Sequence, residues 1–435
     1  MANKKLALLG GKPILKKGLT YFKSSMGKEE IAAVTKVIKG GVLSDFVGRA
    51  GEKFLGGKYV KELEKAYCKK FKVKHAVSFN SATTALHGAI AALGIGPGDE
   101  VIVPPMTMTS TATVILQNNA IPIFADIDED TFCLDPKDVE KKISDRTRAI
   151  MPVNLFGQAA DLDGIMKIAK KHNIKVIEDN AQSPGAKVGK KFAGTVGDIG
   201  VFSLNFHKVI HCGEGGVLVT NDDKLAFHAQ LVRNHGEIVL DDLKDNDTVL
   251  IGTNYRLTEV QAAIAIEQLK KLDFLNRWRV KLAGRLTNKL KRFRGLIPAK
   301  VRENSTHVYY QYAIRFDENL AGIKRKTFAD AIKAEGFSLG EGAVKKPLYA
   351  LPIYQRQTIY KKGVKCPFSC PYYGKEIKYG KGLCPVDERM EEKELLLTPI
   401  CTWPLTEKHI DLFISAVQKV FDNIEELKAY EKNRA

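Results

Sequence analysis

The chain has 435 residues, 44% of them hydrophobic, and a formal net charge of +18 at pH 7. The apolar residues suffice for a full core, which excludes a disordered chain, and no apolar run approaches the roughly 18 residues of a membrane-spanning helix. The excess of Lys and Arg would suit nucleic acid or an acidic substrate, but the sequence has no nucleic-acid-binding motif and no basic block with interleaved aromatic residues. We therefore expect a lysine-rich solvated surface, with neither nucleic acid nor a membrane as partner. The seven cysteines are scattered and odd in number, which indicates reduced thiols and a cytoplasmic location.

Two helices are expected near the N-terminus, on either side of a glycine-rich loop. Apolar residues recur at helical spacing over 29–38 and again over 60–71. Residues 46–58 show no period, and by themselves they indicate a plain connector.

Short apolar strands then alternate with helices. The strands are expected at 76–79, 101–104, 121–127, 149–153, 176–179 and 199–203. The segments between them include a helix at 162–172 and are long enough for right-handed crossovers, so the sequence predicts an α/β fold with a mostly parallel sheet. Ligands of such sheets collect at the carboxyl ends of the strands.

Polar residues at these strand ends predict a cofactor site. One strand closes on Asp179, and the last is followed by Lys208 and a Gly-Glu-Gly-Gly turn at 213–216. An acid and a lysine in this arrangement suit pyridoxal 5′-phosphate (PLP), because the lysine bonds to the aldehyde of the cofactor and the acid pairs with its protonated pyridine nitrogen. The order of acid, Gln182, Ser203, lysine and glycine turn makes this interpretation more specific than a strand-end acid alone.

Residues 80–84 (NSATT) form a turn into a helix and are rich in small and hydroxyl side chains. Free N–H groups at such a helix start suit a phosphate group, but N-capping by Ser or Thr explains many turns of this kind equally well. Asn154 also lies just past a strand end, so several polar groups converge on one edge of the sheet.

The second part of the chain changes in character. A polar loop is expected at 236–252, and Thr258 caps a strong helix at 259–275. From residue 276 a helix rich in Lys and Arg runs to about residue 293. The later expected elements are a β-rich stretch at 308–316, a helix at 327–336 and a last helix after Thr406. We therefore predict a large α/β domain with an N-terminal arm (1–275) and a smaller α/β domain (276–435).

A long irregular insertion at 345–394 interrupts the smaller domain, and we expect it near the substrate pocket because it is the most distinctive part of the sequence. Its cysteines, Cys366, Cys370 and Cys384, would form a zinc site if Cys401 were the fourth ligand. The spacing is not that of standard zinc knuckles, so no metal is predicted.

The stretch from 176 to 220 resembles the DegT/StrS-type aminotransferases, PLP enzymes that aminate nucleotide-linked keto-sugars and related keto-cyclitols. The resemblance covers about residues 6–420 and implies the type I fold of PLP-dependent transferases. It implies that Lys208 holds PLP and then moves a proton as general base and acid, which requires a lowered pKa, and that Asp179 keeps the ring nitrogen protonated. The implied reaction moves an amino group from an amino-acid donor, L-glutamate, to a nucleotide-linked keto-sugar in amino-sugar biosynthesis. A homodimer with shared active sites is implied as well.

The resemblance also implies further contacts to the cofactor. Gln182 is expected beside the ring hydroxyl and Ser203 at the phosphate. Ala82 and Thr83 are expected in the phosphate-binding turn, and Asn254 is expected to reach the phosphate in the neighbouring subunit.

One residue departs from the family pattern. The family often stacks an aromatic ring on the cofactor, in a P-x-x-T-aromatic motif, but residues 104–108 read PPMTM and place Met108 there. A thioether can pack on an aromatic face, so we expect activity with a weaker hold on PLP or a differently shaped pocket.

Three alternatives stay open. A keto-cyclitol acceptor is one, because the opening LALLGGKP, the stretch VYYQYAIR and the insertion resemble scyllo-inosose aminotransferases. A PLP-dependent sugar dehydratase would need His207, not Lys208, at the cofactor, whereas counting back from the glycine turn leads to Lys208. A binding protein that only retains the fold would form no covalent bond to PLP, and Met108 is the one feature that hints at it.

Overall fold

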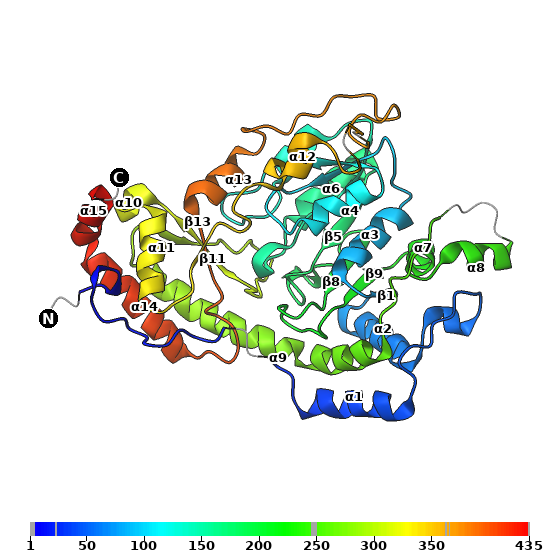
Figure 1. The fold of residues 1–435 in the computed structure, drawn as a ribbon, viewed down its shortest axis with the longest axis horizontal. Helices are drawn as coiled ribbons and strands as arrows, with labels where there is room; N and C mark the ends of the chain where they lie inside the picture. Colours follow the sequence, from blue (N-terminus) through cyan, green and yellow to red (C-terminus); the bar gives the residue numbers. More distant parts are fainter. Residues whose placement is uncertain (1–4, 22–23, 245–249, 362, 365, 434–435) are drawn as a thin grey trace.

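The computed structural model describes residues 5–21, 24–244, 250–361, 363, 364 and 366–433 (Figure 1). The larger half contains a seven-stranded sheet with the strand order β1-β9-β8-β5-β4-β2-β3. The strands are β1 (His75–Phe79), β2 (Glu100–Val103), β3 (Ile121–Phe124), β4 (Thr147–Ile150), β5 (Lys175–Asp179), β8 (Ile199–Ser203) and β9 (Gly216–Thr220). Of these seven strands, β9 alone runs against the others. The predicted α/β fold with a mostly parallel sheet is therefore confirmed.

Helices cover both faces of this sheet, as a parallel sheet requires. The helices of this half are α1 (Lys28–Gly40), α2 (Lys58–Phe71), α3 (Ala82–Ala92), α4 (Ser110–Gln117), α5 (Pro136–Lys142), α6 (Leu162–His172), α7 (Asp223–Arg233) and α8 (Gly236–Leu243). Val101 and Val103 of β2 join the apolar cluster that includes residues of α3, α4 and α7. Ile102, between them, joins the cluster that includes α6, because successive side chains of a strand point to opposite faces.

The predicted polar loop at 236–252 is wrong in its first part. Residues of this stretch form α8, and Val239 and Leu240 are buried against Phe54 and Leu231. A single apolar turn among acidic residues was too short a signal to indicate a helix. Residues 245–249 lie outside the described part of the chain. The remaining short elements of this half are η2 (Glu52–Leu55), η3 (Leu155–Gly157), β6 (Lys187–Val188) and β7 (Lys191–Phe192).

Helix α9 (Glu259–Leu290) joins the two halves without a break. The Thr258 hydroxyl accepts a hydrogen bond from the Gln261 N–H and caps the helix, as predicted. The predicted domain boundary at 275/276 falls inside this helix, near the point where its buried face passes from the core of the larger half to that of the smaller half. Leu272 packs in the core of the larger half and Leu286 in the core of the smaller half.

The smaller half packs helices against an antiparallel sheet in the order β10-β11-β13-β12. Its strands are β10 (Leu296–Pro298), β11 (Tyr312–Phe316), β12 (Gly340–Glu341) and β13 (Leu395–Thr398). Its helices are α10 (Glu318–Ala321), α11 (Arg325–Ala334), α14 (Glu407–Asp422) and α15 (Ile424–Lys432). The expected helices at 327–336 and after Thr406 are thus present.

The N-terminal arm packs on this smaller half, although the sequence had assigned it to the larger domain. Leu6, just before the turn η1 (Ala7–Leu9), is fully buried in the C-terminal core. The Glu335 carboxylate accepts hydrogen bonds from the Ala7 and Ile14 N–H groups and pairs with Lys419. A buried ion pair therefore holds the arm against the far end of the chain.

The insertion at 345–394 packs on the edge of the seven-stranded sheet. Its short elements are η4 (Leu348–Ala350), α12 (Pro352–Arg356), α13 (Pro385–Arg389) and the π-turn η5 (Met390–Glu394). Tyr349, Tyr354 and Tyr379 surround Phe124 of β3 with ring centroids 5.3–5.6 Å away. The insertion thus covers an edge strand that would otherwise expose unpaired backbone groups.

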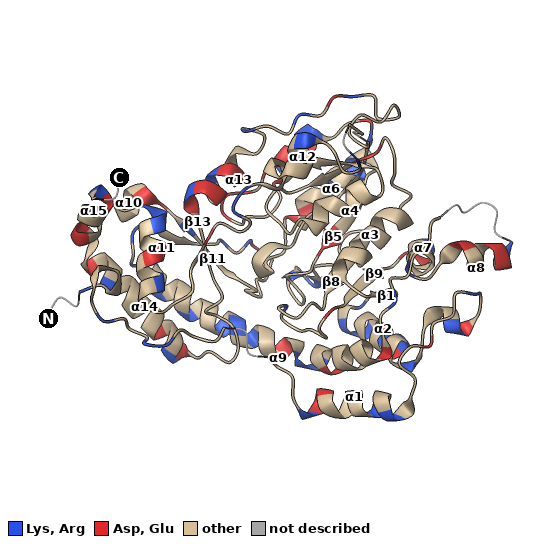
Figure 2. Cartoon of the chain, viewed as in Figure 1, with Lys and Arg blue, Asp and Glu red and all other residues tan. Residues whose placement is uncertain are grey.

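Figure 2 shows Lys and Arg spread along both halves and interspersed with Asp and Glu, which agrees with the expected solvated surface. None of the helices in the described ranges is both long enough and apolar enough to cross a membrane.

Candidate active site

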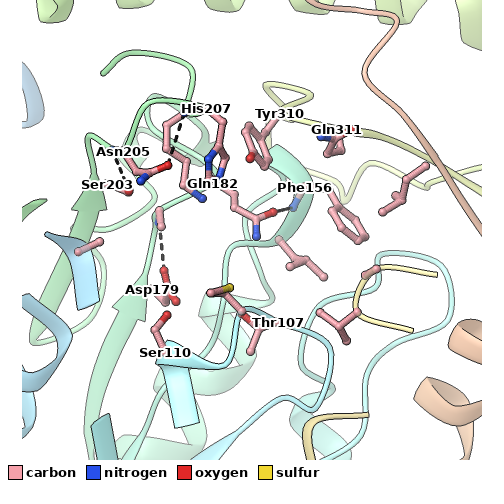
Figure 3. A pocket seen from close by; sticks show the side chains of 18 of the residues that line it. Thr107, Ser110, Phe156, Asp179, Gln182, Ser203, Asn205, His207, Tyr310 and Gln311 are labelled. Atoms are coloured by element: carbon pink, nitrogen blue, oxygen red, sulfur yellow. Dashed lines mark hydrogen bonds between the residues drawn. The ribbon is translucent and has the colours of Figure 1, made fainter. Parts of the chain in front are cut away.

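A cavity of about 530 Å³ opens at the carboxyl ends of β5 and β8. This volume lies within the range of small-molecule sites. The larger half contributes the start of α3, the segment before α4 and the ends of β5 and β8, and the smaller half contributes residues around Tyr310, Gly342 and Leu397. Figure 3 shows Asp179, Gln182 and Tyr310 around this hollow.

Lys208 lies on the segment that follows β8 and lines the cavity. Burial lowers the pKa of its ammonium group, and the nearby Asp179 carboxylate opposes this effect. Its nitrogen lies 5.0 Å from the centre of the Tyr310 ring. A lowered pKa increases the neutral fraction of the amine, which is the form that bonds to an aldehyde or accepts a proton.

Asp179, the last residue of β5, is buried at the base of the cavity. Its Oδ2 accepts a hydrogen bond from the Thr111 hydroxyl at 2.8 Å, and its Oδ1 accepts one from the Ala181 N–H at 3.1 Å. Burial raises its pKa, whereas these two hydrogen bonds and Lys208 lower it. Each carboxylate oxygen keeps a free lone pair, so the group can accept a proton-bearing ring nitrogen.

The start of α3 forms one wall of the cavity through Ala82 and Thr83. The hydroxyl of Ser81 accepts the Thr84 N–H, whereas the N–H groups of Ala82 and Thr83 before it are available to an anion. A Cβ atom at Gly216 would lie 2.5 Å from the Ala82 nitrogen, so the first position of β9, where the glycine turn ends, requires glycine. The turn at 80–84 and the glycine turn at 213–216 are far apart in the sequence but pack directly against each other at the cavity.

Gln182 is held in a defined orientation. The Phe156 N–H donates a hydrogen bond to Gln182 Oε1 at 2.9 Å, which directs the amide NH₂ of Gln182 away from that contact (Figure 3). Phe156 has φ 56° and ψ 4°, a left-handed conformation that is uncommon for a bulky residue. The backbone strain at Phe156 therefore accompanies an oriented side-chain donor in the cavity.

The structure brings together seven of the eight predicted cofactor residues. The residues that line the cavity are Ala82, Thr83, Met108, Asp179, Gln182, Ser203 and Lys208. Met108 is 63% exposed, at the mouth. Asn254 does not line the cavity of this chain; its side chain is exposed and its Oδ1 accepts a hydrogen bond from Arg256 Nε at 2.8 Å. The role of each residue stays a prediction.

Sequence reasoning missed Thr111, Tyr310 and the wall formed by residues 338–344. The Thr107–Thr111 spacing in PMTMTST was a signal for two hydroxyls on one face, and the aromatic run around Tyr310 was noted without a role. No described residue of 345–394 lines the cavity itself. The insertion nevertheless lies next to it, because the Glu391 carboxylate accepts hydrogen bonds from the N–H groups of Ala343 and Val344 in the cavity wall. The zinc alternative fails on packing, since Cys384 and Cys401 belong to different apolar clusters.

The residues present fit PLP: a buried acid, a half-buried amine and a helix start with free N–H groups lie in one cavity. Bound PLP supplies an aldehyde that bonds to amines and a ring that delocalises electrons. The fold and the site therefore define a type I PLP-dependent enzyme.

Residues 25–391 match the model of the DegT/DnrJ/EryC1/StrS aminotransferase family, and the chain belongs to this family. It is 34% identical to the spore coat polysaccharide biosynthesis protein SpsC of Bacillus subtilis (strain 168), over 82% of this chain and 91% of SpsC. It is 36% identical to the GDP-perosamine synthase of Caulobacter vibrioides, over 76% of this chain and 87% of the synthase. The crystal structure of S. venezuelae DesV superposes with a TM-score of 0.75 at 28% identity, covering 90% of this chain and 94% of DesV. The chain is a PLP-dependent aminotransferase, as the sequence predicted.

Proposed function

We propose that the enzyme transfers an amino group from L-glutamate to the ketone carbon of a nucleotide-linked keto-sugar. The observation that carries the proposal is that the half-buried Lys208 amine and the buried Asp179 carboxylate share a cavity that both halves line. The Caulobacter relative is named for a GDP-linked sugar, which supports an acceptor of this class.

The residues of the chain divide the work between binding and proton transfer. Lys208 moves a proton between the donor Cα and the C4′ carbon of the cofactor, a task that its lowered pKa favours. Asp179 holds the ring nitrogen protonated, and the amide NH₂ of Gln182 donates to the ring oxygen. Ser203 and the start of α3, at Ala82 and Thr83, hold the phosphate.

We further propose a homodimer with shared active sites. Helix α1 lies on the outer side of the larger half, next to α9 (Figure 1). Its Ile31 and Ile38 side chains are 69% and 56% exposed. Exposed apolar residues of this kind are typical of an interface. The exposed Asn254 would then reach the phosphate in the partner's cavity, which explains why it lines no cavity of its own chain. The proposal places the enzyme in the cytoplasm, where its seven free cysteines would stay reduced.

A keto-cyclitol is a second candidate acceptor, and the charge of the cavity favours it. Among the described residues that line the cavity, Lys208 is the one lysine or arginine. Burial lowers the pKa of His207, which favours its neutral form. A diphosphate usually binds to several cationic groups, whereas an uncharged cyclitol needs none.

The first experiment follows the visible absorbance of the PLP-loaded protein during titration with L-glutamate, with Lys208→Ala alongside. Loss of the band of lysine-bound PLP in the wild type, and absence of that band in Lys208→Ala, would support amino transfer through Lys208. Nucleotide-linked keto-sugars and scyllo-inosose are then tested separately for restoring the band, and the ketone that restores it identifies the acceptor class. Persistence of the same band in Lys208→Ala would contradict the proposal, because PLP would then be bonded to another amine.

A further inference from the structure

Two threonine hydroxyls form a chain that ends on Asp179. The Thr111 hydroxyl donates to Asp179 Oδ2 at 2.8 Å, and Thr107 Oγ1 lies 3.1 Å from Thr111 Oγ1. All three side chains are buried. Thr107 and Asp179 line the cavity but Thr111 does not, so Thr111 contacts the Asp179 carboxylate from the side that faces away from the cavity.

The direction of these hydrogen bonds follows from counting protons. An ionised carboxylate only accepts, so the single proton of the Thr111 hydroxyl is committed to Asp179. Thr111 must then accept from Thr107, whose proton is committed in turn. Both hydroxyl dipoles therefore point toward Asp179 and favour its negative charge.

The fold fixes these two hydrogen bonds at the carboxyl ends of the strands of the seven-stranded sheet. Thr111 is the second residue of α4, and its own N–H bonds to the Met108 carbonyl at 3.1 Å. Its hydroxyl is therefore not needed to cap the helix. A β-branched side chain has few χ1 rotamers, so Thr111 loses little entropy by holding this position.

We propose that Thr111, supported by Thr107, is a positioning residue that fixes the orientation and the negative charge of Asp179 toward the ring nitrogen of PLP. The Ala181 N–H holds the second oxygen at 3.1 Å, so the carboxylate is fixed at both oxygens before the cofactor binds. This assignment concerns the cofactor end of the cavity and does not depend on the identity of the acceptor.

The charges around Asp179 set the expected pH dependence. Lys208 faces it from the segment after β8 and lowers its pKa, while burial raises it. Glu178, its neighbour on β5, is held by the N–H groups of Val196 and Gly197 at 2.7 and 2.8 Å. Loss of the Thr111 hydroxyl would raise the pKa of Asp179 further. On acidification, the variant would therefore lose the negative charge of Asp179 at a higher pH than the wild type does.

The test measures the PLP dissociation constant by fluorescence quenching from pH 5.5 to 8.5, without donor or ketone. Thr111→Val, which keeps the shape but removes the hydroxyl, is expected to bind PLP about tenfold more weakly, and its affinity should fall off about one pH unit higher than in the wild type. Thr111→Ser should restore both properties. Thr113→Val is the matched control, because two residues along a helix turn the side chain about 200° away.

Wild-type affinity and pH dependence in Thr111→Val would overturn the assignment. Equal weakening in Thr111→Val and Thr111→Ser would overturn it as well, because binding would then depend on the packing of the whole side chain rather than on the hydroxyl. If Thr111→Val does not fold, Thr111→Ala carries the same expectation. Thr107→Val should weaken binding in the same direction but less, and unchanged binding would refute the role of Thr107.

Discussion

The side-chain nitrogen of Lys208 lies 5.0 Å from the centre of the Tyr310 ring, on a residue from the other half of the molecule. Burial raises the pKa of the Tyr310 hydroxyl to about 12, so this group stays a protonated donor at neutral pH. Tyr310 therefore contributes to the site in two ways that can be separated: its ring lies beside the Lys208 amine, and its hydroxyl is a hydrogen-bond donor at the cavity wall.

Replacement of Tyr310 by Phe separates them. The ring and its contact with Lys208 remain, so PLP affinity should change by less than about threefold, while kcat/KM for amino transfer should fall about tenfold through loss of one hydrogen-bond donor. Steady-state kinetics beside a PLP titration checks this. An equal loss in both quantities would show that Tyr310 acts on cofactor binding instead.

Gln182→Glu tests the oriented amide. The glutamate can still accept the Phe156 N–H, but it replaces the NH₂ donor by a carboxylate oxygen facing the anionic ring oxygen of PLP. We expect about tenfold weaker PLP binding at pH 8, with recovery at lower pH as the carboxyl group takes up a proton. Weakening that does not vary with pH would point to altered packing.

Gly216→Ala should disturb the phosphate end. The added Cβ would lie 2.5 Å from the Ala82 nitrogen and must push the start of α3 away. We expect a loss of about 2 kcal/mol in the free energy of unfolding together with weaker binding of inorganic phosphate. Gly284→Ala in α9 is the control, because nothing lies within 4 Å of its Cβ, and it should be neutral or slightly stabilising.

Asp387→Asn should change the pH dependence of stability. Burial raises the pKa of Asp387 to about 9 from its ordinary 3.8, with the charges of Glu391 and Asp126 adding to the effect, and neither carboxyl oxygen has a hydrogen-bond partner among the described residues. The folded state keeps the proton up to about pH 9 while the unfolded chain loses it near 3.8, so the wild type loses stability as pH rises through this window. At pH 8 the variant should be more stable by about 1 kcal/mol or more, and thermal unfolding between pH 5 and 9 should show a flatter curve. Parallel curves for the two proteins would contradict this assignment.

The double variant Ile31→Glu, Ile38→Glu tests the proposed dimer. Charges on this exposed face of α1 should yield monomers in sedimentation velocity without unfolding the chain. Weaker PLP binding should accompany dissociation if Asn254 serves the partner's site. Ile251→Glu alone, at another exposed apolar position, shows how far the interface extends.

The cofactor end of the site was readable from the sequence because its signals are local. Asp179 ends its own strand, and Lys208 stands at a fixed distance from its own glycine turn. Thr111 could not be assigned, because its partner is 68 residues away and only the sheet edge brings them together. Tyr310 depends on how the two halves dock, which no periodicity reports.

The same limit applies to the smaller half. The change of composition near residue 276 falls where the buried face of α9 passes from one core to the other, between Leu275 and Leu282, although the helix is continuous. The insertion supplies aromatic rings to an edge strand, and its Glu391 also holds the cavity-wall backbone at Ala343 and Val344. Neither contact has a local signal in the sequence.

Helix α9 and the N-terminal arm have a practical consequence for dissecting this enzyme. A cut at residue 275 would divide a 32-residue helix and would leave Leu6 on one fragment and the core that buries it on the other. Neither piece would carry a complete interior, so each should be insoluble when expressed by itself. When the two fragments are coexpressed, each would supply the core residues that the other lacks. Residue 275 is therefore suited to a split enzyme, in which PLP binding reports reassembly.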